Sequence, residues 1–532
     1  MRRRDFLQAT ITAGVAMMAG PAMGSEALGG QSSAPPSFEL DEITLDQLRE
    51  KLRSGEETSR SLVHKYLERI AQIDKSGPGL NSVIELNPEA EAIATRLDAQ
   101  MSSPTGPLHG IPVLIKDNID TADRMHTTAG SMALAGNIAA HDSFVAAQLR
   151  KAGAVILGKT NLSEWANFRS TRSTSGWSGR GRQTHNPYAL DRNPSGSSSG
   201  SGAAVSASLC AVAVGTETDG SIVSPSNNNG IVGIKPTVGL IPRTGIIPIS
   251  HSQDTAGPMA RTVRDAAILL GVLAGYDPAD PASKRSFVSD YTSALDPNGL
   301  KGARIGVARK FFGFSDPVDA VMAAAIDAMK AAGAVMVDPA DIPTLGKFDD
   351  SEQIGLIYEF KTDLERYFAT MDPSVGIRTM KDLIDFNEKH RDVEMPYFGQ
   401  ELCLQAVNKG PLTEKAYLDA VRKNRRLARK EGIDAIMDKE KLDAIIAPTG
   451  GPAWTTDLIN GDHFTGGSSS PAAVAGYPDV TVPAGFVMGL PVGISFFGRA
   501  YSEATLIKLA YSFEQATKHR QPPKFLPTLP FV

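Results

Sequence analysis

The spacing of apolar positions changes several times along the chain between helical and extended patterns. Residues 38–74 have a helical pattern, in which Thr58 and Ser59 are good cap residues and apolar positions then recur every three or four residues. Further helices are predicted over residues 88–101, 141–153 and 503–517. Short apolar runs predict buried strands over residues 111–115, 154–157, 231–234, 444–447, 480–482 and 492–496. This alternation of strands and helices predicts an α/β fold.

Other segments carry less regular patterns. Residues 169–202 are rich in Ser, Thr, Gly, Arg and Asn, which inside a compact protein indicates a mobile or a functional stretch. The small apolar residues 203–214 predict a helix buried on all sides, and residues 215–221 a Gly/Ser turn. Residues 160–167 predict a further helical segment, and residues 348–428 a mostly helical, charged region.

The organisation of the chain favours one large domain. Length alone would suggest three or four domains, but no long linker interrupts residues 38–532 and no repeat of fixed period is present. We expect an export signal over residues 1–24 and a flexible, Gly/Ser/Pro-rich lead-in over residues 25–37.

The N-terminus has the features of a twin-arginine export signal. Arg3 and Arg4 precede Asp-Phe-Leu, a mildly apolar stretch follows over residues 9–20, and Ala22-Met23-Gly24 is a plausible cleavage site. The alternative is an exposed basic N-terminus. No later segment has the 18 or so apolar residues of a membrane span, so we expect no stable membrane insertion. The sequence therefore predicts a protein exported by the twin-arginine route, periplasmic or secreted.

Composition and charge exclude several classes of protein. The 532 residues include 50 glycines and 34 prolines, too few for a collagen-like or disordered chain. A net charge of −5 and a pI near 6.0 give no electrostatic footprint for nucleic acid. The nine histidines show no metal-binding spacing, so no metal is expected. Two cysteines, Cys210 and Cys403, cannot form a disulfide scaffold, and whether they pair is open.

Two familiar serine motifs are excluded, the first by its context and the second by its absence. Residues 196–200 match the G-x-S-x-G pattern of a nucleophile elbow, but that motif needs a preceding strand, and residues 191–195 (DRNPS) are not one. No serine stands three residues before a lysine, which excludes the Ser-x-x-Lys acylases.

Two serine-bearing loops and one lysine remain as candidate chemistry. Glycines beside Ser197 and Ser221 allow close approach of the backbone to a ligand, and consecutive N–H groups before Ser221 could hold an oxyanion. A serine hydroxyl needs a base, and Lys116 ends an apolar run where desolvation would lower its pKa. The alternative is that Lys116 is a surface lysine and the serines are turn residues. Composition alone favours that alternative.

Motif blocks distributed over most of the chain overturn that preference. They are GSSSGSG at 196–202, GTETDGSI at 215–222, VGIKPT at 232–237, GIPVLIKDN at 110–118, TTAGS at 127–131, GAVILGKTN at 153–161, AGYPDVTVPAG at 475–485 and GLPVG at 489–493. In content and order these blocks resemble the amidase signature family. The likeness runs from about residue 38 to the C-terminus.

The resemblance implies a fold and a mechanism. The fold would be one large amidase-signature domain, a mixed central β-sheet covered by helices on both faces. Ser221 would be the nucleophile, Ser197 a bridging serine after a cis peptide bond, and Lys116 the base. Backbone N–H groups of Thr218, Asp219 and Gly220 would form the oxyanion hole, with Gly130 and Ser131 as possible substrate-binding residues. The family needs no metal or organic cofactor.

The nucleophile loop departs from the usual signature. Asp219-Gly220 stand where two glycines are usual, and Glu217 takes the place of an aspartate. With residues 237–261 and the segment from Asp462 to Pro471, this variant resembles the peptide amidase branch, which removes the C-terminal amide of peptides. A turn-capping role is the alternative for Asp219.

Other functions stay open at this point. Small aliphatic or aryl amides, or acylated amines, are alternative substrates, and a non-catalytic binding protein on an amidase scaffold is an alternative class. The transamidating subunit of a tRNA-dependent amidotransferase is also similar, but predicted export and the missing basic footprint argue against it. In the helical region, Leu356, Tyr358 and Phe360 could line a pocket or belong to the core, and we favour the core.

Overall fold

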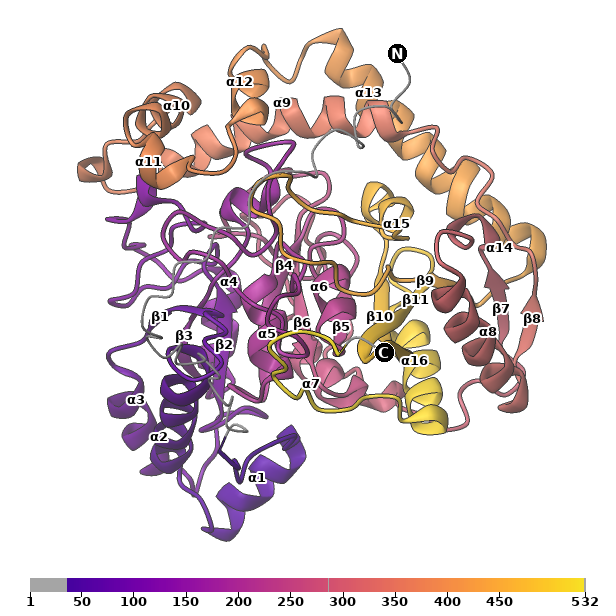
Figure 1. Cartoon of the computed structure of the whole chain (residues 1–532), viewed down its shortest axis with the longest axis horizontal. Helices are drawn as coiled ribbons and strands as arrows, with labels where there is room; N and C mark the ends of the chain where they lie inside the picture. The colour runs from indigo at the N-terminus through magenta and orange to yellow at the C-terminus, as the bar shows by residue number, and fades with distance from the viewer. Residues whose placement is uncertain (1–35, 286, 531–532) are drawn as a thin grey trace, which may run out of the picture. The chain divides into compact units, whose positions relative to one another are not determined.

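A computed structural model describes residues 36–285 and 287–530. Contacts divide the chain into two units, Met1–Ala34 and Pro35–Val532, and the fold described below is that of the second unit alone. The predicted export signal and most of the lead-in therefore lie outside the described residues and stay predictions. The described chain folds around one large mixed sheet, as expected (Figure 1).

Eleven strands of the described chain form this sheet. In spatial order they are β1 (Val83–Leu86), β3 (Val155–Thr160), β2 (Pro112–Lys116), β4 (Val212–Glu217), β6 (Thr255–Ala260), β5 (Val232–Lys235), β10 (Asp479–Val487), β11 (Leu490–Phe497), β9 (Ala444–Pro448), β7 (Arg304–Val307) and β8 (Val335–Val337). β2 runs parallel to both β3 and β4, whereas β4, β6, β5, β10 and β11 pair antiparallel in that order. The six predicted strands are confirmed, with ends that differ by a few residues.

Sixteen α-helices of the described chain accompany the sheet. They are α1 (Leu45–Ser54), α2 (Ser59–Arg69), α3 (Ala90–Asp98), α4 (Phe144–Lys151), α5 (Ser199–Ser206), α6 (Val223–Asn228), α7 (Val263–Leu273), α8 (Asp316–Ala331), α9 (Asp349–Phe368), α10 (Met380–Lys389), α11 (Arg391–Glu394), α12 (Glu401–Val407), α13 (Lys415–Arg425), α14 (Asp434–Glu440), α15 (Ser470–Ala475) and α16 (Glu503–Thr517). The helix predicted to start at Thr58 is confirmed, with Thr58 capping α2 through a bond from Ser61 N–H.

Helices cover both faces of the sheet. α5 and α6 pack together against the central strands, and α4, α7, α16 and α8 form a connected row against the sheet. The mostly helical region after residue 348 is confirmed, and α9 and α13 lie side by side along the upper edge in Figure 1. Leu356 and Phe360 belong to a buried cluster of this region, as expected, and Tyr358 is buried as well.

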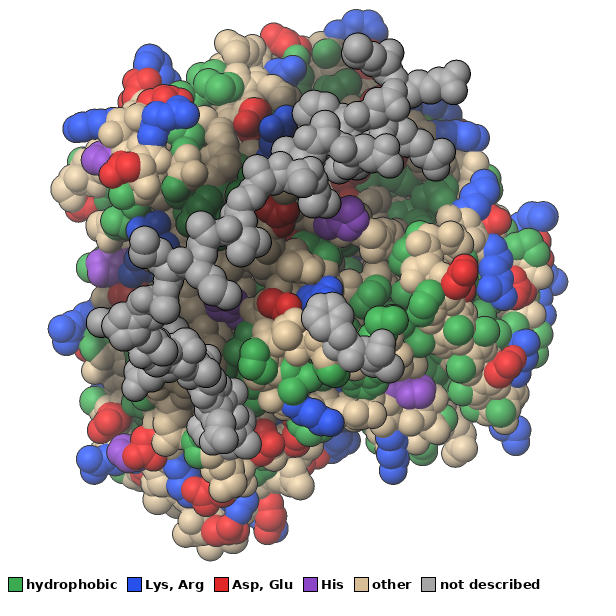
Figure 2. Space-filling view, viewed as in Figure 1, with side chains coloured by type: hydrophobic (Ala, Val, Ile, Leu, Met, Phe, Trp, Pro, Cys, Tyr) green, Lys and Arg blue, Asp and Glu red, His purple; other side chains and the backbone are tan. Residues whose placement is uncertain are grey.

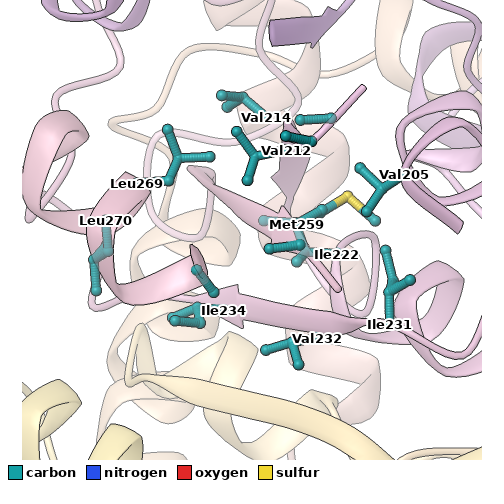
Figure 3. Packing of buried hydrophobic residues seen from close by; sticks show 14 of the residues in the cluster. Val205, Val212, Val214, Ile222, Ile231, Val232, Ile234, Met259, Leu269 and Leu270 are labelled. Atoms are coloured by element: carbon teal, nitrogen blue, oxygen red, sulfur yellow. The ribbon is translucent and has the colours of Figure 1, made fainter. Parts of the chain in front are cut away.

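The core between the sheet and α5 and α7 supports the loop that holds Ser221. Figure 3 shows Val212 and Val214 of β4 on the side of Leu269 and Leu270 of α7, whereas Met259 of β6 points to the other face of the sheet, toward Val205 of α5. Ile222, the residue after Ser221, is fully buried in the same cluster. The loop is therefore anchored in close-packed apolar side chains, which resist displacement.

The helix predicted over residues 203–214 is wrong in its second half. α5 ends at Ser206, Ser208 has a φ of +55°, and residues 212–217 form β4, paired along its whole length with β6. The run of small apolar residues carried no periodicity, and the β-branched Val212 and Val214 fit a fully buried strand. The turn predicted over residues 215–221 accordingly starts only after Glu217.

The helical prediction for residues 160–167 is also wrong. β3 continues to Thr160, and after it the chain forms a short 3₁₀ turn (Glu164–Asn167) in which Trp165 and Ala166 have φ near +50°. The Glu164 carboxylate accepts a 2.5 Å bond from Gly179 N–H and pairs with Arg169 at 2.6 Å. These long-range contacts fix a backbone that local propensity does not favour. Much of the polar stretch 169–202 is buried.

Two further sequence questions are answered. Cys210 and Cys403 are both buried and free. Among the described residues, no helix combines the length and the apolar character required to cross a bilayer.

Candidate active site

A buried lysine ends β2, an interior strand of the sheet. All five residues of β2 are buried, and Lys116, the last of them, has no exposed surface. Neighbouring strands on both sides exclude water, because β2 lies between β3 and β4. Desolvation lowers the pKa of Lys116 to about 7, against the opposing charges of Asp254 and Glu217. A large share of Lys116 is therefore neutral near pH 7 and able to accept a proton.

The Lys116 amine contacts one serine and one threonine. Its Nζ lies 2.7 Å from Ser197 Oγ, 2.8 Å from Thr216 Oγ1 and 3.3 Å from Thr216 O. Thr216 Oγ1 accepts a further bond from Asn118 Nδ2 at 3.0 Å. A neutral amine has two N–H donors and one lone pair. When both donors point to Thr216, the lone pair faces the Ser197 hydroxyl.

The two predicted serine loops meet at the end of β4. Ser198 N–H donates to Ser221 O at 3.1 Å, and Ser198 Oγ bonds both the N–H and the carbonyl of Thr216. The Gly196–Ser197 peptide bond is cis. A Cβ on Gly196 would lie 2.2 Å from Ser163 Oγ, so any larger residue there would have to displace that hydroxyl. The structure thus brings Lys116, Ser197 and Ser221 into one region, and Ser221 keeps 8% of its surface exposed.

The side chain of Glu217 organises the loop around Ser221. Its carboxylate accepts bonds from the N–H groups of Gly220 at 2.9 Å, Ile222 at 2.7 Å and Val223 at 3.0 Å. Burial raises the pKa of Glu217, and the charge of the buried Lys235 opposes this increase most strongly. The sequence marked Glu217 only as a departure from the usual signature. Its role as the acceptor that shapes the loop required the structure.

The three predicted oxyanion donors differ in their surroundings. Gly220 N–H is already bonded to Glu217, and Gly220 has a φ of +78°. For Asp219 N–H no hydrogen bond is found in the described part of the chain. The Asp219 side chain accepts a bond from Ser469 Oγ, and burial together with the charge of Asp219 raises the pKa of Glu352 to about 8. Sequence reasoning missed Glu352, because nothing local ties α9 to this loop.

Gly130 and Ser131 lie in a neighbouring loop with contacts of its own. Gly130 N–H donates to Asp117 Oδ2 at 3.3 Å, and Ser131 Oγ donates to Glu394 Oε1 at 3.3 Å. Both residues are buried. Within the described residues neither bonds to the lysine or the two serines. Gly130 thus ties this loop to the residue that follows Lys116 and Ser131 ties it to the end of α11, and a role of the two residues in substrate binding stays a prediction.

A cluster of metal-binding residue types lies elsewhere. His251, Glu359 and Asp363 have ligand atoms within 4.8 Å of one another. Their atoms are already paired within the protein, with His251 Nδ1 2.7 Å from Asp363 Oδ2 and Tyr417 OH 2.7 Å from Glu359 Oε1. The cluster fits a network of charged hydrogen bonds that joins α9 and α13 to the loop before β6.

The visible surface shows no large area of one charge. In Figure 2, basic and acidic side chains are interspersed along the rim of a hollowed face, and the visible part of the hollow is mostly uncharged.

Comparisons with known proteins extend over almost the whole described unit. Residues 61–507 match the family model described as Amidase. A protein of Arabidopsis thaliana named as a probable amidase is 42% identical over 504 residues, which cover 92% of this chain and 93% of that protein. The native peptide amidase from Stenotrophomonas maltophilia has a TM-score of 0.87 at 50% identity, covering 92% of this chain and 100% of that chain. A peptide amidase in complex with the competitive inhibitor chymostatin has a TM-score of 0.88 at 50% identity, covering 91% and 100%.

Proposed function

Because the chain belongs to the amidase signature family and is a serine amidase, we propose that it hydrolyses the C-terminal carboxamide of a peptide to a carboxylate and ammonia. The contact that carries this proposal is the 2.7 Å approach of the buried Lys116 Nζ to Ser197 Oγ. It pairs a base of suitable pKa with the hydroxyl of Ser197, whose neighbour Ser198 is bonded through its N–H to Ser221 O. The peptide substrate is supported by the similarity to structures of a peptide amidase.

The first half of the reaction acylates Ser221. Neutral Lys116 takes the proton of Ser197, and Ser197 takes that of Ser221, whose oxygen forms a bond to the amide carbonyl carbon. The oxyanion would be held by N–H groups at Thr218 and Asp219, each such donor contributing about 3 kcal/mol. The C–N bond then breaks while the same relay delivers the proton to the leaving nitrogen, and ammonia departs.

The second half regenerates the enzyme. A water molecule loses a proton to the relay and attacks the acyl carbon, and the bond from that carbon to Ser221 Oγ breaks. The Ser221 oxygen recovers the proton held by the relay, and the acid product loses its own proton to solvent and leaves as a carboxylate. Lys116 is neutral again at the end.

Ammonia release from an amidated dipeptide tests this mechanism. We expect no release by Ser221→Ala and almost none by Lys116→Ala. The matched control is Ser226→Ala on α6, because Ser226 Oγ is buried without a hydrogen-bond partner in the described chain and its loss should leave activity intact. Full activity in either of the first two variants contradicts the assignment.

A substrate panel decides which amide is used. Peptide amides, free small amides and anilides are compared by ammonia or amine release under identical conditions. Preference for the amidated peptides supports the proposal, whereas faster turnover of small amides or anilides makes the protein an amidase of those compounds. No turnover of any amide, together with failure of a serine-directed phosphonate to label Ser221, indicates a binding protein on this scaffold.

We further propose export through the twin-arginine route, which rests on the N-terminal motif alone. Replacing both arginines in Arg3→Lys/Arg4→Lys should keep the full-length protein in the cytoplasm of an expressing bacterium, whereas the unchanged chain accumulates outside it in a shorter form. Cell fractionation with immunoblotting measures this. Export of the variant at the unchanged rate contradicts the proposal.

A further inference from the structure

Asp254 directly precedes β6, the strand that pairs with β4, and β4 leads into the Ser221 loop. β4 and β6 pair antiparallel, with Thr216 opposite Ala256 and Glu217 opposite Thr255. Continuing this register by one residue places Thr218 opposite Asp254. A 2.6 Å hydrogen bond from Thr218 Oγ1 to Asp254 Oδ1 shows that the two side chains meet.

The Asp254 carboxylate is itself fixed. Its other oxygen accepts bonds from the N–H groups of Ile249 and Ser250, both at 2.8 Å. The neighbouring Gln253 donates to Thr218 O at 3.3 Å and to Glu352 on α9 at 2.9 Å. Thr218 is therefore held by its hydroxyl and by its carbonyl. Charge-assisted bonds of this kind are stronger than neutral ones, so the anchor is stiff.

Asp254 also lies near the proposed base, because Lys116 Nζ bonds Thr216 Oγ1 at 2.8 Å, and Thr216, Thr218 and Asp254 line one small cavity. Among the carboxylates that raise the pKa of Lys116 against its desolvation, Asp254 has the larger effect and Glu217 the smaller. Burial raises the pKa of Asp254 to about 6, and the bonds from Thr218 and the backbone and the charge of Arg243 oppose this increase. Asp254 is therefore mostly an anion at neutral pH. Arg243 is already paired with Asp280 at 2.6 Å.

We propose that Asp254 is a positioning residue of the amidase reaction, which fixes Thr218 in the Ser221 loop and places a buried negative charge near the amine of Lys116. This inference rests on the proposed function of Lys116 and Ser221. It assigns two separable effects to one carboxylate. The bond to Thr218 holds an oxyanion donor in place, and the charge sets the pH range in which the base is neutral.

The charge effect is tested by Asp254→Asn. The variant keeps the size of the side chain, and the Thr218 hydroxyl can turn and accept a bond from the amide. Removal of the anion lowers the pKa of Lys116, so the acid limb of the kcat/KM profile moves to lower pH. The pH dependence of phosphonate labelling at Ser221 should move by the same amount, which gives a readout that does not depend on the substrate.

The matched control is Glu359→Gln. Glu359 is fully buried on α9 and bonds Ser250 Oγ and Ser252 N–H in the same loop, but it is not among the charges acting on Lys116. We expect this variant to keep the acid limb of the unchanged protein. Melting curves of both variants show that they are folded in the assay.

The positioning effect is tested at Thr218. Thr218→Val removes the hydroxyl but leaves the backbone N–H and the Asp254 charge, and we expect kcat to fall about tenfold with little change in KM, since the donor acts mainly in the transition state. Thr218→Ser restores the hydroxyl and should restore most of kcat. Thr218→Ser, which keeps the bond to Asp254, should also keep the acid limb in place.

The outcomes separate this inference from the proposed function. If Ser221 is not labelled in the unchanged protein, the proposed function fails first. If labelling and its acid limb are present but Asp254→Asn leaves that limb in place, the charge effect assigned to Asp254 is wrong. If Thr218→Val keeps full kcat, or Thr218→Ser does not rescue a loss, the positioning effect is wrong.

Discussion

A single buried amine carries the chemistry at the scale of residues. Lys116 has no exposed surface and is surrounded by two strands, a serine and a threonine, so water cannot stabilise its charged form. The pKa of about 7 follows from this burial rather than from a positive neighbour. The same burial that weakens the ammonium form makes the amine a usable base at neutral pH.

The pH dependence of activity follows from that pKa. Below about pH 7 Lys116 binds a proton and cannot accept one from Ser197, so kcat/KM should rise with pH through about 7 and then level off. Initial rates of ammonia release between pH 5 and pH 9 measure this, with circular dichroism as the control for folding. A rate that is constant from pH 5 to pH 8 contradicts the role of Lys116.

Glu217 provides a second prediction at this scale. In Glu217→Gln one carboxylate oxygen becomes an NH₂ group that faces backbone donors, so at least one bond from Gly220, Ile222 or Val223 is lost. Hydrogen bonds to a charged group contribute about 1.5–3 kcal/mol, and we expect a loss of unfolding free energy in that range. Denaturant melts measure it. Glu217→Asp keeps the charge and should lose less, and an equal loss contradicts the explanation.

At the scale of elements, a buried charge cluster attaches the helical region to the rest. Arg169, Glu164 and Glu394 have no exposed side-chain surface, and Arg169 lies 2.6 Å from Glu164 and 3.7 Å from Glu394. Glu394 ends α11 and also accepts the N–H of Met132 at 2.5 Å. Two carboxylates thus share one guanidinium. Burial raises the pKa of Glu164, and repulsion by the negative charge of Glu394 raises it further.

Removal of that guanidinium should be costly. Arg169→Ala leaves two buried carboxylates facing each other, and breaking a buried pair in this way costs about 3–5 kcal/mol. The matched control is Arg391→Ala on α11, whose pair with Glu388 is exposed and should contribute less than about 1 kcal/mol. Chemical denaturation compares the two. A similar cost for both variants contradicts the importance of the buried cluster.

The elements also show what the sequence could predict. Strands such as β2 and β9 were found because short apolar runs are local signals, and α2 was found because its apolar spacing and its cap residues are local signals as well. The start of β4 was missed because a fully buried strand and a buried helix have the same all-apolar pattern. The turn at Trp165 is fixed by contacts with Arg169 and Gly179, which no local pattern encodes.

The residues of the candidate site also fall into two groups, those that the sequence indicated and those that only the structure revealed. Lys116 was found from the apolar run that ends with it, and Ser197 and Ser221 from motif blocks. Glu217, Asp254 and Glu352 act through contacts formed only after folding, so their roles were outside the reach of sequence patterns.

At the scale of the whole molecule, one continuous sheet joins the two halves of the described chain. β5, from the first half, pairs with β10, from the second, and Ile234 lies opposite Val480 at this junction. Both residues are fully buried in the main hydrophobic cluster. A chain of 532 residues would otherwise suggest several independently stable domains. The shared sheet and core instead predict that the halves unfold together.

Calorimetry should therefore record one unfolding transition, with loss of amidase activity in the same temperature range. Ile234→Ala removes apolar volume at the junction and should cost about 2–5 kcal/mol. Because the junction belongs to both halves, this variant should move the whole transition to lower temperature without splitting it. Val335→Ala is the control, since Val335 lies on the edge strand β8 and is 45% exposed, so it should change little. Two separated transitions, in either the unchanged protein or Ile234→Ala, would show that the halves are independent and that the sheet does not couple them.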